Sequence, residues 1–294
     1  YLQSKEIRER LSRRDPDRYE ADLASTCFNL GVLYHEYGRS EEAERYYLQS
    51  KEIRERLSRR DPDRYEADLA STCFNLGVLY HEYGRSEEAE RYYLQSKEIR
   101  ERLLQRDPER YEADLAAICY NLGNFYSGRG RPDEAERYYL QSKELYERLS
   151  QRDPEQYKAN LAMTCNNLGV LYYNLGRPDE AERCYLQSKE IRERFSESDP
   201  EQYEADLAST CNNLGVLYDR LGRSEEAERS YLQSKEIRER LSRRDPDRYE
   251  ADLAEICNKL GDFYFKQRRL AEAAWLFIQS KELYERLSQR KPGS

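Results

Sequence analysis

The sequence has few of the residues on which most enzyme sites depend. Its 294 residues include two histidines, one methionine, one tryptophan and thirteen glycines. Two histidines leave little scope for general acid–base catalysis, and no glycine-rich loop is present to cradle a phosphate. Because no nucleophile–base set or phosphate loop is found, we predict a protein that is not an enzyme and that needs no cofactor.

Long hydrophobic runs are also missing. No stretch approaches the roughly 18 consecutive apolar residues of a membrane span, and the first residues show no charged-then-apolar signal segment. We therefore expect a cytoplasmic protein that does not cross a membrane. The net charge is -8, with basic side chains interleaved among acidic ones, so the chain has no basic patch for nucleic acid.

The composition is too polar for one compact core. Charged residues make up 37% of the chain and hydrophobic residues 38%, whereas a globular domain of this size carries more apolar residues to bury. The 27 tyrosines and the regularly placed leucines still supply apolar surface, which argues against disorder. The composition therefore predicts an elongated fold with a thin, repeating core.

A 46-residue period organises the chain. The segment YLQSKE begins at Tyr1, Tyr47, Tyr93, Tyr139, Tyr185 and Tyr231, and FIQSKE begins at Phe277. Six periods and an 18-residue remainder account for all residues, so we expect one domain over 1–294. Residues 1–15 then form an isolated second helix that no first helix precedes, and residues 277–294 form the end of the last helix and a tail.

Each period reads as two helices. Asp61 and Pro62 predict the start of a first helix, which runs to about Tyr83 and ends at Gly84. Ser86, which we expect to cap the second helix, begins a segment that continues to about Arg106. The sequence therefore predicts an all-α protein of about 13 helices.

An apolar stripe on the first helix forms the core seam. Leu69, Cys73, Leu76 and Tyr80 recur at steps of three or four residues and therefore share one face. Six of the seven cysteines occupy the same seam position, 46 residues apart. Successive thiols then lie on neighbouring first helices, about 8–10 Å apart or more, which is too far for a disulfide. We interpret them as buried small apolar residues, with no metal site.

The repeated motif resembles a known family. Each period contains C-x-x-L-G-x-x-Y followed by A-x-x-x-Y, as in Cys27 to Tyr34 and Ala43 to Tyr47. This pattern resembles the tetratricopeptide repeat, although the period is longer than the usual one. The motif C-N-N-L-G-x-L-Y from Cys165 to Tyr172 resembles the repeats of the kinesin light chain group. The resemblance implies a right-handed superhelical solenoid of antiparallel helix hairpins that binds other proteins.

The repeats differ from one another mainly on one face of the first helix. This face, which we call the second face, lies about half a turn from the seam and comprises Ser25, Phe28, Asn29, Val32, His35 and Glu36 with their equivalents 46 residues apart. In a stack of hairpins it lines the concave surface. Its side chains change from aromatic to amide to charged along the chain, which is typical of a binding groove.

One asparagine recurs on the second face in five repeats, at Asn29, Asn75, Asn121, Asn167 and Asn213. An amide offers donors and an acceptor to the backbone of an extended peptide, and the resemblance implies this role here. We expect apolar pockets from Phe28, Phe74, Tyr120, Val32, Val78, Val170 and Val216, and further groove contacts from His35, His81 and Tyr173.

Two other interpretations stay open. The asparagines could instead bond neighbouring helices and set the repeat spacing. The whole chain could be an engineered or structural array that self-associates head to tail through its ends, since the last helix is unusually apolar around Trp275 and the chain starts within a second helix. Such an array would have no dedicated ligand, whereas the binding groove requires a protein or peptide partner.

Overall fold

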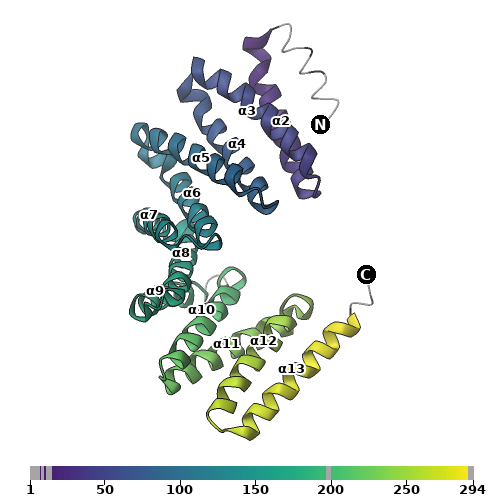
Figure 1. Ribbon diagram of the computed structural model, residues 1–294, viewed down its shortest axis with the longest axis vertical. Coiled ribbons are helices and arrows are strands. Elements are labelled where there is room, and N and C mark those ends of the chain that lie inside the picture. The colour runs from purple at the N-terminus through teal and green to yellow at the C-terminus, as the bar shows by residue number, and fades with distance from the viewer. Residues whose placement is uncertain (1–6, 8–9, 11–14, 197–199, 291–294) are drawn as a thin grey trace. The chain divides into compact units, whose positions relative to one another are not determined.

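The computed structural model describes residues 7, 10, 15–196 and 200–290, and in that part every regular element is an α-helix (Figure 1). The bounds are α2 Pro16–Glu36, α3 Ser40–Arg60, α4 Pro62–Glu82, α5 Ser86–Arg106, α6 Pro108–Gly128, α7 Pro132–Arg152, α8 Pro154–Asn174, α9 Pro178–Ser196, α10 Pro200–Arg220, α11 Ser224–Arg244, α12 Pro246–Lys266 and α13 Leu270–Arg290. The all-α class is confirmed, whereas the helix expected over residues 1–15 lies almost entirely outside the described residues. No described helix has the length and apolarity needed to cross a membrane.

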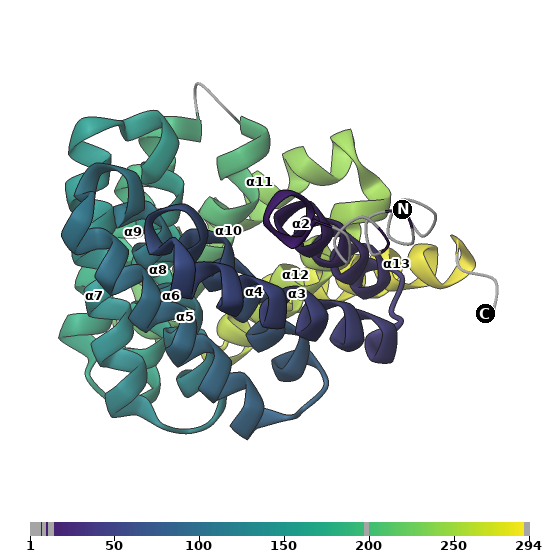
Figure 2. The same cartoon turned by 90° about the horizontal axis from the view of Figure 1, so that it is seen from above.

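The helices fall into two compact units, Tyr1–Leu145 and Tyr146–Ser294, with the boundary inside α7. In the first unit α2 packs on α3, α3 on α4, α4 on α5 and α5 on α6; in the second, the series runs from α8 to α13 in the same way. Short turns join the helices of each pair, as between α4 and α5; Figure 2 shows the helices from above. The consecutive pairs confirm a solenoid of hairpins. The organisation of 1–294 as one right-handed superhelix stays a prediction.

The helix ends follow the signals in the sequence at most positions. Asp61 caps α4, since its Oδ1 accepts a hydrogen bond of 3.2 Å from the backbone N–H of Arg64. Gly84 adopts a φ of +72°, which allows the left-handed turn that ends the helix. The expected cap of α5 was wrong. Ser86 is the first helical residue and Arg85 occupies the cap position without a side-chain cap bond.

Arg85 instead forms ion pairs with two glutamates at this turn. Its Nε donates to the Glu88 carboxylate at 3.0 Å, and this contact lowers the pKa of Glu88. Its Nη1 donates across to Glu44 of the preceding repeat at 2.9 Å, and the hydroxyl of Tyr80 donates to the same carboxylate at 2.8 Å. A glutamate that accepts from a tyrosine and an arginine of the next repeat recurs at Glu90 with Tyr126 and Arg131, Glu182 with Tyr218 and Arg223, and Glu228 with Tyr264 and Arg269.

The core seam lies on the face of the first helix that the apolar stripe predicts. Leu69, Cys73, Leu76 and Tyr80 are buried on α4, and all seven cysteines are free and buried. Burial raises the pKa of the Cys73 thiol to about 12. Gly77 permits the closest approach of the two helices, because a Cβ built there would lie 2.5 Å from Cδ1 of Tyr93 on α5. The interpretation of the cysteines as buried apolar residues is confirmed.

A buried arginine joins each hairpin to the next in part of the chain. Arg54 on α3 donates from Nη1 to the backbone oxygen of Asp68 at 3.0 Å and to Oγ1 of Thr72 at 2.6 Å, both on α4. Arg192 makes the same two contacts, with Asp206 and Thr210. Burial lowers the pKa of the Arg54 guanidinium, because the charged form loses solvation there. These bonds set the position of one first helix against the hairpin before it.

Candidate functional site

The second face belongs to the first helices of the hairpins, which within each unit contact one another directly. α2 contacts α4 in the first unit, and α8 contacts α10 in the second. Residues of the second face from successive first helices therefore come close together. This is the arrangement that an extended ligand lying across several helices requires.

In the second unit three first helices supply one pocket. It lies over the second face and its floor includes Tyr231 of α11. The lining residues are Tyr173 of α8, Val216, Asp219 and Arg220 of α10, Lys259, Asp262 and Lys266 of α12, and Tyr231. The structure thus brings together the predicted site residues Tyr173 and Val216 and adds a set of charges of both signs.

Two of these charges pair with each other, and a third lies against an aromatic ring. Lys266 Nζ lies 2.7 Å from Oδ2 of Asp219, and the guanidinium of Arg220 lies 5.0 Å from the ring centroid of Tyr173. Burial raises the pKa of the Tyr231 hydroxyl, and the nearby Asp219 carboxylate adds to this shift. The pocket is therefore a polar surface with charges of both signs beside the rings of Tyr173 and Tyr231.

In the first unit the equivalent positions carry histidine. His35 Nε2 lies 2.6 Å from Oε2 of Glu82 on the next first helix. The ring of His81 has no such carboxylate. It stands edge-on to Phe125 at 5.3 Å and to Tyr93 at 6.3 Å between ring centroids. The two histidines, which the sequence presents as equivalent, therefore have different surroundings.

Sequence reasoning missed the partners in these contacts. Each joins a residue on one first helix to the residue 47 positions later: His35 with Glu82, Tyr173 with Arg220, and Asp219 with Lys266. The 46-residue period hides this offset by aligning equivalent positions, whereas the contact lies one residue further on. A search for complementary pairs at a spacing of 47 could have found them.

The aromatic residues of the second face lie partly against their own hairpin. Phe28 packs on Tyr47 with ring centroids 5.8 Å apart, and the guanidinium of Arg54 lies 4.8 Å from its ring. Phe74 and Tyr120 pack in the same way on Tyr93 and Tyr139. All three rings are half-buried, so they offer one edge to a ligand.

The asparagine row is not uniform. Asn75 Nδ2 donates to the backbone oxygen of Ser71 at 2.9 Å and Asn121 donates in the same way to Ala117 at 2.8 Å, so each bonds its own helix. Asn213 instead reaches the preceding repeat and donates to Oδ1 of Asn166 at 3.2 Å. Asn29 is exposed, and Asn167 is half-buried and accepts a bond of 3.4 Å from Asn166. The five amides therefore differ in their contacts within the protein, and both the peptide role and the spacing role stay predictions.

The valines and the tyrosines beneath them complete the surface. Val170 is 37% exposed, and Val32, Val78 and Val216 are half-buried. The hydroxyl of Tyr47 is buried and has no hydrogen-bond partner among the described residues. Its equivalent Tyr139 donates to Oδ1 of Asn124 at 2.6 Å. A polar atom of the floor is therefore left unpaired in the first repeat.

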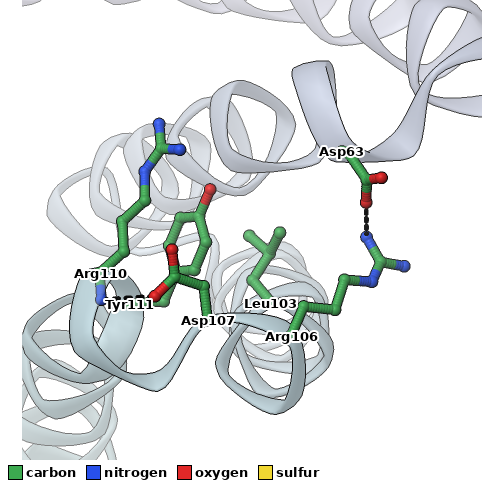
Figure 3. Close-up of a pocket in the computed structure, with 6 residues that line it drawn as sticks. All are labelled: Asp63, Leu103, Arg106, Asp107, Arg110 and Tyr111. Atoms are coloured by element: carbon green, nitrogen blue, oxygen red, sulfur yellow. Dashed lines mark hydrogen bonds and ion pairs between the residues drawn. The ribbon is translucent and has the colours of Figure 1, made fainter.

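A second hollow lies at the turn between α5 and α6 (Figure 3). In Figure 3 Arg106 points toward Asp63, with Nη1 to Oδ1 at 3.1 Å, and Asp107 turns toward the backbone N–H of Arg110, which it caps. Arg106 and Asp63 form an ion pair, whereas the guanidinium of Arg110 lies 5.2 Å from the ring centroid of Tyr111. Across the described residues, no group of three or more His, Cys, Asp or Glu side chains could hold a metal ion.

Comparison with known proteins identifies the repeats. Sequence models of the tetratricopeptide repeat match residues 26–61, 69–109, 114–194, 159–240 and 253–291, which together cover most of the chain. A search of curated proteins gives no significant match.

Solved structures share the fold. BtubC (BKLC) from P. vanneervenii is 23% identical with a TM-score of 0.68, over 87% of this chain and 94% of that one. The apo form of RapI is 14% identical with a TM-score of 0.60, over 90% and 99%. A structure from P. anserina, described as kinesin light chain TPR-like repeats that are nearly identical to one another, is 19% identical to this chain with a TM-score of 0.58, over 77% of this chain and 99% of that one. With the repeat motif, the helix pairs and the sequence models in agreement, the chain belongs to the tetratricopeptide repeat family.

Proposed function

We propose that this protein is a cytoplasmic, non-enzymatic scaffold whose second face binds an extended segment of a partner protein. Repeat proteins of this type mediate protein–protein interactions. The observation that carries the proposal is the pocket formed by α8, α10 and α12, because residues from three successive repeats line it. An extended peptide is the ligand whose length matches such a surface.

The side chains of the second face suit the backbone and the side chains of such a peptide. The exposed amide of Asn29 can donate to a peptide carbonyl and accept from a peptide N–H. Asn75 and Asn121 each use one donor on their own helix and retain an acceptor and a second donor. The half-buried aromatic rings and valines between them would receive apolar side chains of the peptide.

A triple alanine variant tests the proposal. Asn29→Ala, Asn75→Ala and Asn121→Ala together, all in the first unit, should weaken binding of peptides selected by the full chain from a random library by at least about tenfold, since each lost bond is worth about 1 kcal/mol. Fluorescence anisotropy measures the affinity, and thermal melting measures stability.

The matched control replaces exposed amides on the second helices, Gln105→Ala with Gln151→Ala. This control should bind peptide as the parent does. Unchanged affinity in the triple variant, or a melting midpoint lowered by it and not by the control, would assign the asparagines to repeat spacing.

Self-association remains a second candidate, because α13 exposes large apolar side chains. Trp275 is 55% exposed and Ile278 is 56% exposed, with Lys235 Nζ 5.3 Å from the Trp275 ring. Sedimentation over a range of concentrations separates the two candidates. Assembly that Trp275→Glu abolishes would support an association surface on α13, and a monomer at every concentration would remove it.

A further inference from the structure

On the second face, complementary side chains of successive first helices contact each other at equivalent positions. A histidine meets a carboxylate at His35 and Glu82, an aromatic ring meets a guanidinium at Tyr173 and Arg220, and a carboxylate meets an ammonium at Asp219 and Lys266. The chemistry changes from step to step, but the partner is in each case the residue 47 positions later. The same place between two first helices is thus filled in each unit by a matched side chain.

These contacts are interrupted between α4 and α6. The residue 47 positions after His81 is Gly128, which has no side chain to offer. A Cβ built at Gly128 meets nothing within 4 Å, so the place opposite His81 is open. His81 is exposed, and its imidazole makes no hydrogen bond to the described residues.

Two aromatic rings pack against the imidazole of His81 at the open place. The rings of Phe125 and Tyr93 stand at 86° and 85° to the imidazole of His81 and hold it edge-on. Phe125 is 1% exposed and Tyr93 is 2% exposed, so both belong to the packed core and cannot move aside. Because these rings are covered, they support the imidazole from the core side, and a ligand would meet the imidazole itself.

We propose that this open place is a side-chain pocket for an aspartate or glutamate of the bound peptide. The preceding repeat supplies the template, because Oε2 of Glu82 lies 2.6 Å from Nε2 of His35 at the equivalent position. A peptide carboxylate at His81 would accept the same bond from a ring N–H, strengthened by charge when the imidazole is protonated. The proposal rests on the proposed function, since the peptide must lie along the second face for its side chain to enter.

Two charged side chains lie next to this place in the sequence, and both already have partners. Glu82, next to His81 in sequence, is already committed to His35. On the α6 side the residue after Gly128 is Arg129, whose Nη1 donates to Oγ of Ser86 at 2.7 Å. The nearest charge beyond Gly128 along the chain is therefore positive.

The experiment uses the full chain and the peptides that it selects from a random library, roughly ten residues long to span several helices. We expect aspartate or glutamate at one position of the selected peptides. Replacing that residue by asparagine or glutamine should weaken binding at least about fivefold, as expected for a charge-assisted bond. With two histidines in the chain, their ring signals in nuclear magnetic resonance spectra can be assigned individually, and the acidic peptide should shift His81 and not His35.

Three variants locate the pocket. Gly128→Glu supplies the missing internal carboxylate and should abolish the acidic preference, and His81→Ala should do the same. Gly128→Ala, which adds a methyl group without a carboxylate, should retain it. Peptide binding without acidic preference, or with an unmoved His81 signal, would overturn the pocket and leave the proposed function standing. Failure to select any peptide that contacts the second face would overturn both.

Discussion

At the scale of the residue, the glycines show how closely this fold depends on single atoms. Gly77 lies where the ring of Tyr93 crosses α4, and a Cβ there would be 2.5 Å from ring atom Cδ1. Tyr93 is buried and has no space into which to move. Gly128, on the next first helix, has open space around it.

Gly77→Ala should therefore lower the free energy of unfolding by about 1–3 kcal/mol, the usual cost of overpacking. Gly128→Ala should leave it unchanged or raise it by less than about 1 kcal/mol, because alanine is the better helix former. Urea denaturation followed by circular dichroism measures both. Equal effects of the two substitutions would contradict the close approach at Gly77.

At the scale of the element, the packing of one hairpin on the next depends on whether a buried arginine finds its partner. Arg54 reaches the hydroxyl of Thr72. In the next repeat the residue equivalent to Thr72 is Ile118, and Arg100 donates instead to Ser96 on its own helix at 2.6 Å. The Nε of Arg100 is buried with no hydrogen-bond partner among the described residues, and its ion-pair partner Asp114 is 3.9 Å away, too far for a hydrogen bond. An unpaired buried donor costs about 1–3 kcal/mol.

Ile118→Thr should therefore raise the free energy of unfolding by on the order of 1 kcal/mol, because it restores the hydroxyl that Arg54 uses. The reciprocal change Thr72→Ile should lower stability by a similar amount. Both are measured by urea denaturation against the parent chain. If Ile118→Thr destabilises the chain as polar substitutions in a core usually do, the arginine is not limited by its missing partner.

The bounds of the helices were predictable because local chemistry sets them. Asp61 before a proline and Gly84 after the last apolar residue place the ends of α4 to within one residue. Arg268 is the exception that local rules miss: it adopts a φ of +63° where the other repeats have glycine. The His35–Glu82 pair could not be read from the period, because the one-residue offset arises only when one first helix packs on the next.

At the scale of the whole molecule, the buried thiols make the free energy of unfolding depend on pH in the alkaline range. Burial raises the pKa of Cys73, Cys119 and Cys211 to about 12 and that of Cys257 to about 11. In the unfolded chain a thiol ionises near pH 8.5. Between these values the unfolded state binds fewer protons than the folded state, so the free energy of unfolding falls as pH rises.

We expect urea denaturation to show a lower free energy of unfolding at about pH 10.5 than at about pH 8. Replacing Cys73 and Cys119 by alanine should make this fall shallower, because alanine carries no proton to lose. A free energy of unfolding that is constant across the interval would show that the folded thiols ionise as readily as the unfolded ones.

The contacts between residues 47 positions apart bear on how a chain of this kind can change its length. Residues 1–57 are identical to residues 47–103, so a further copy of this 46-residue unit would place a histidine opposite a glutamate again. Only the last copy would face the position that Gly128 holds. Gene duplication or loss could therefore add or remove whole repeats in this stretch and keep the same lateral contacts, while the single interruption opposite a histidine is inherited unchanged.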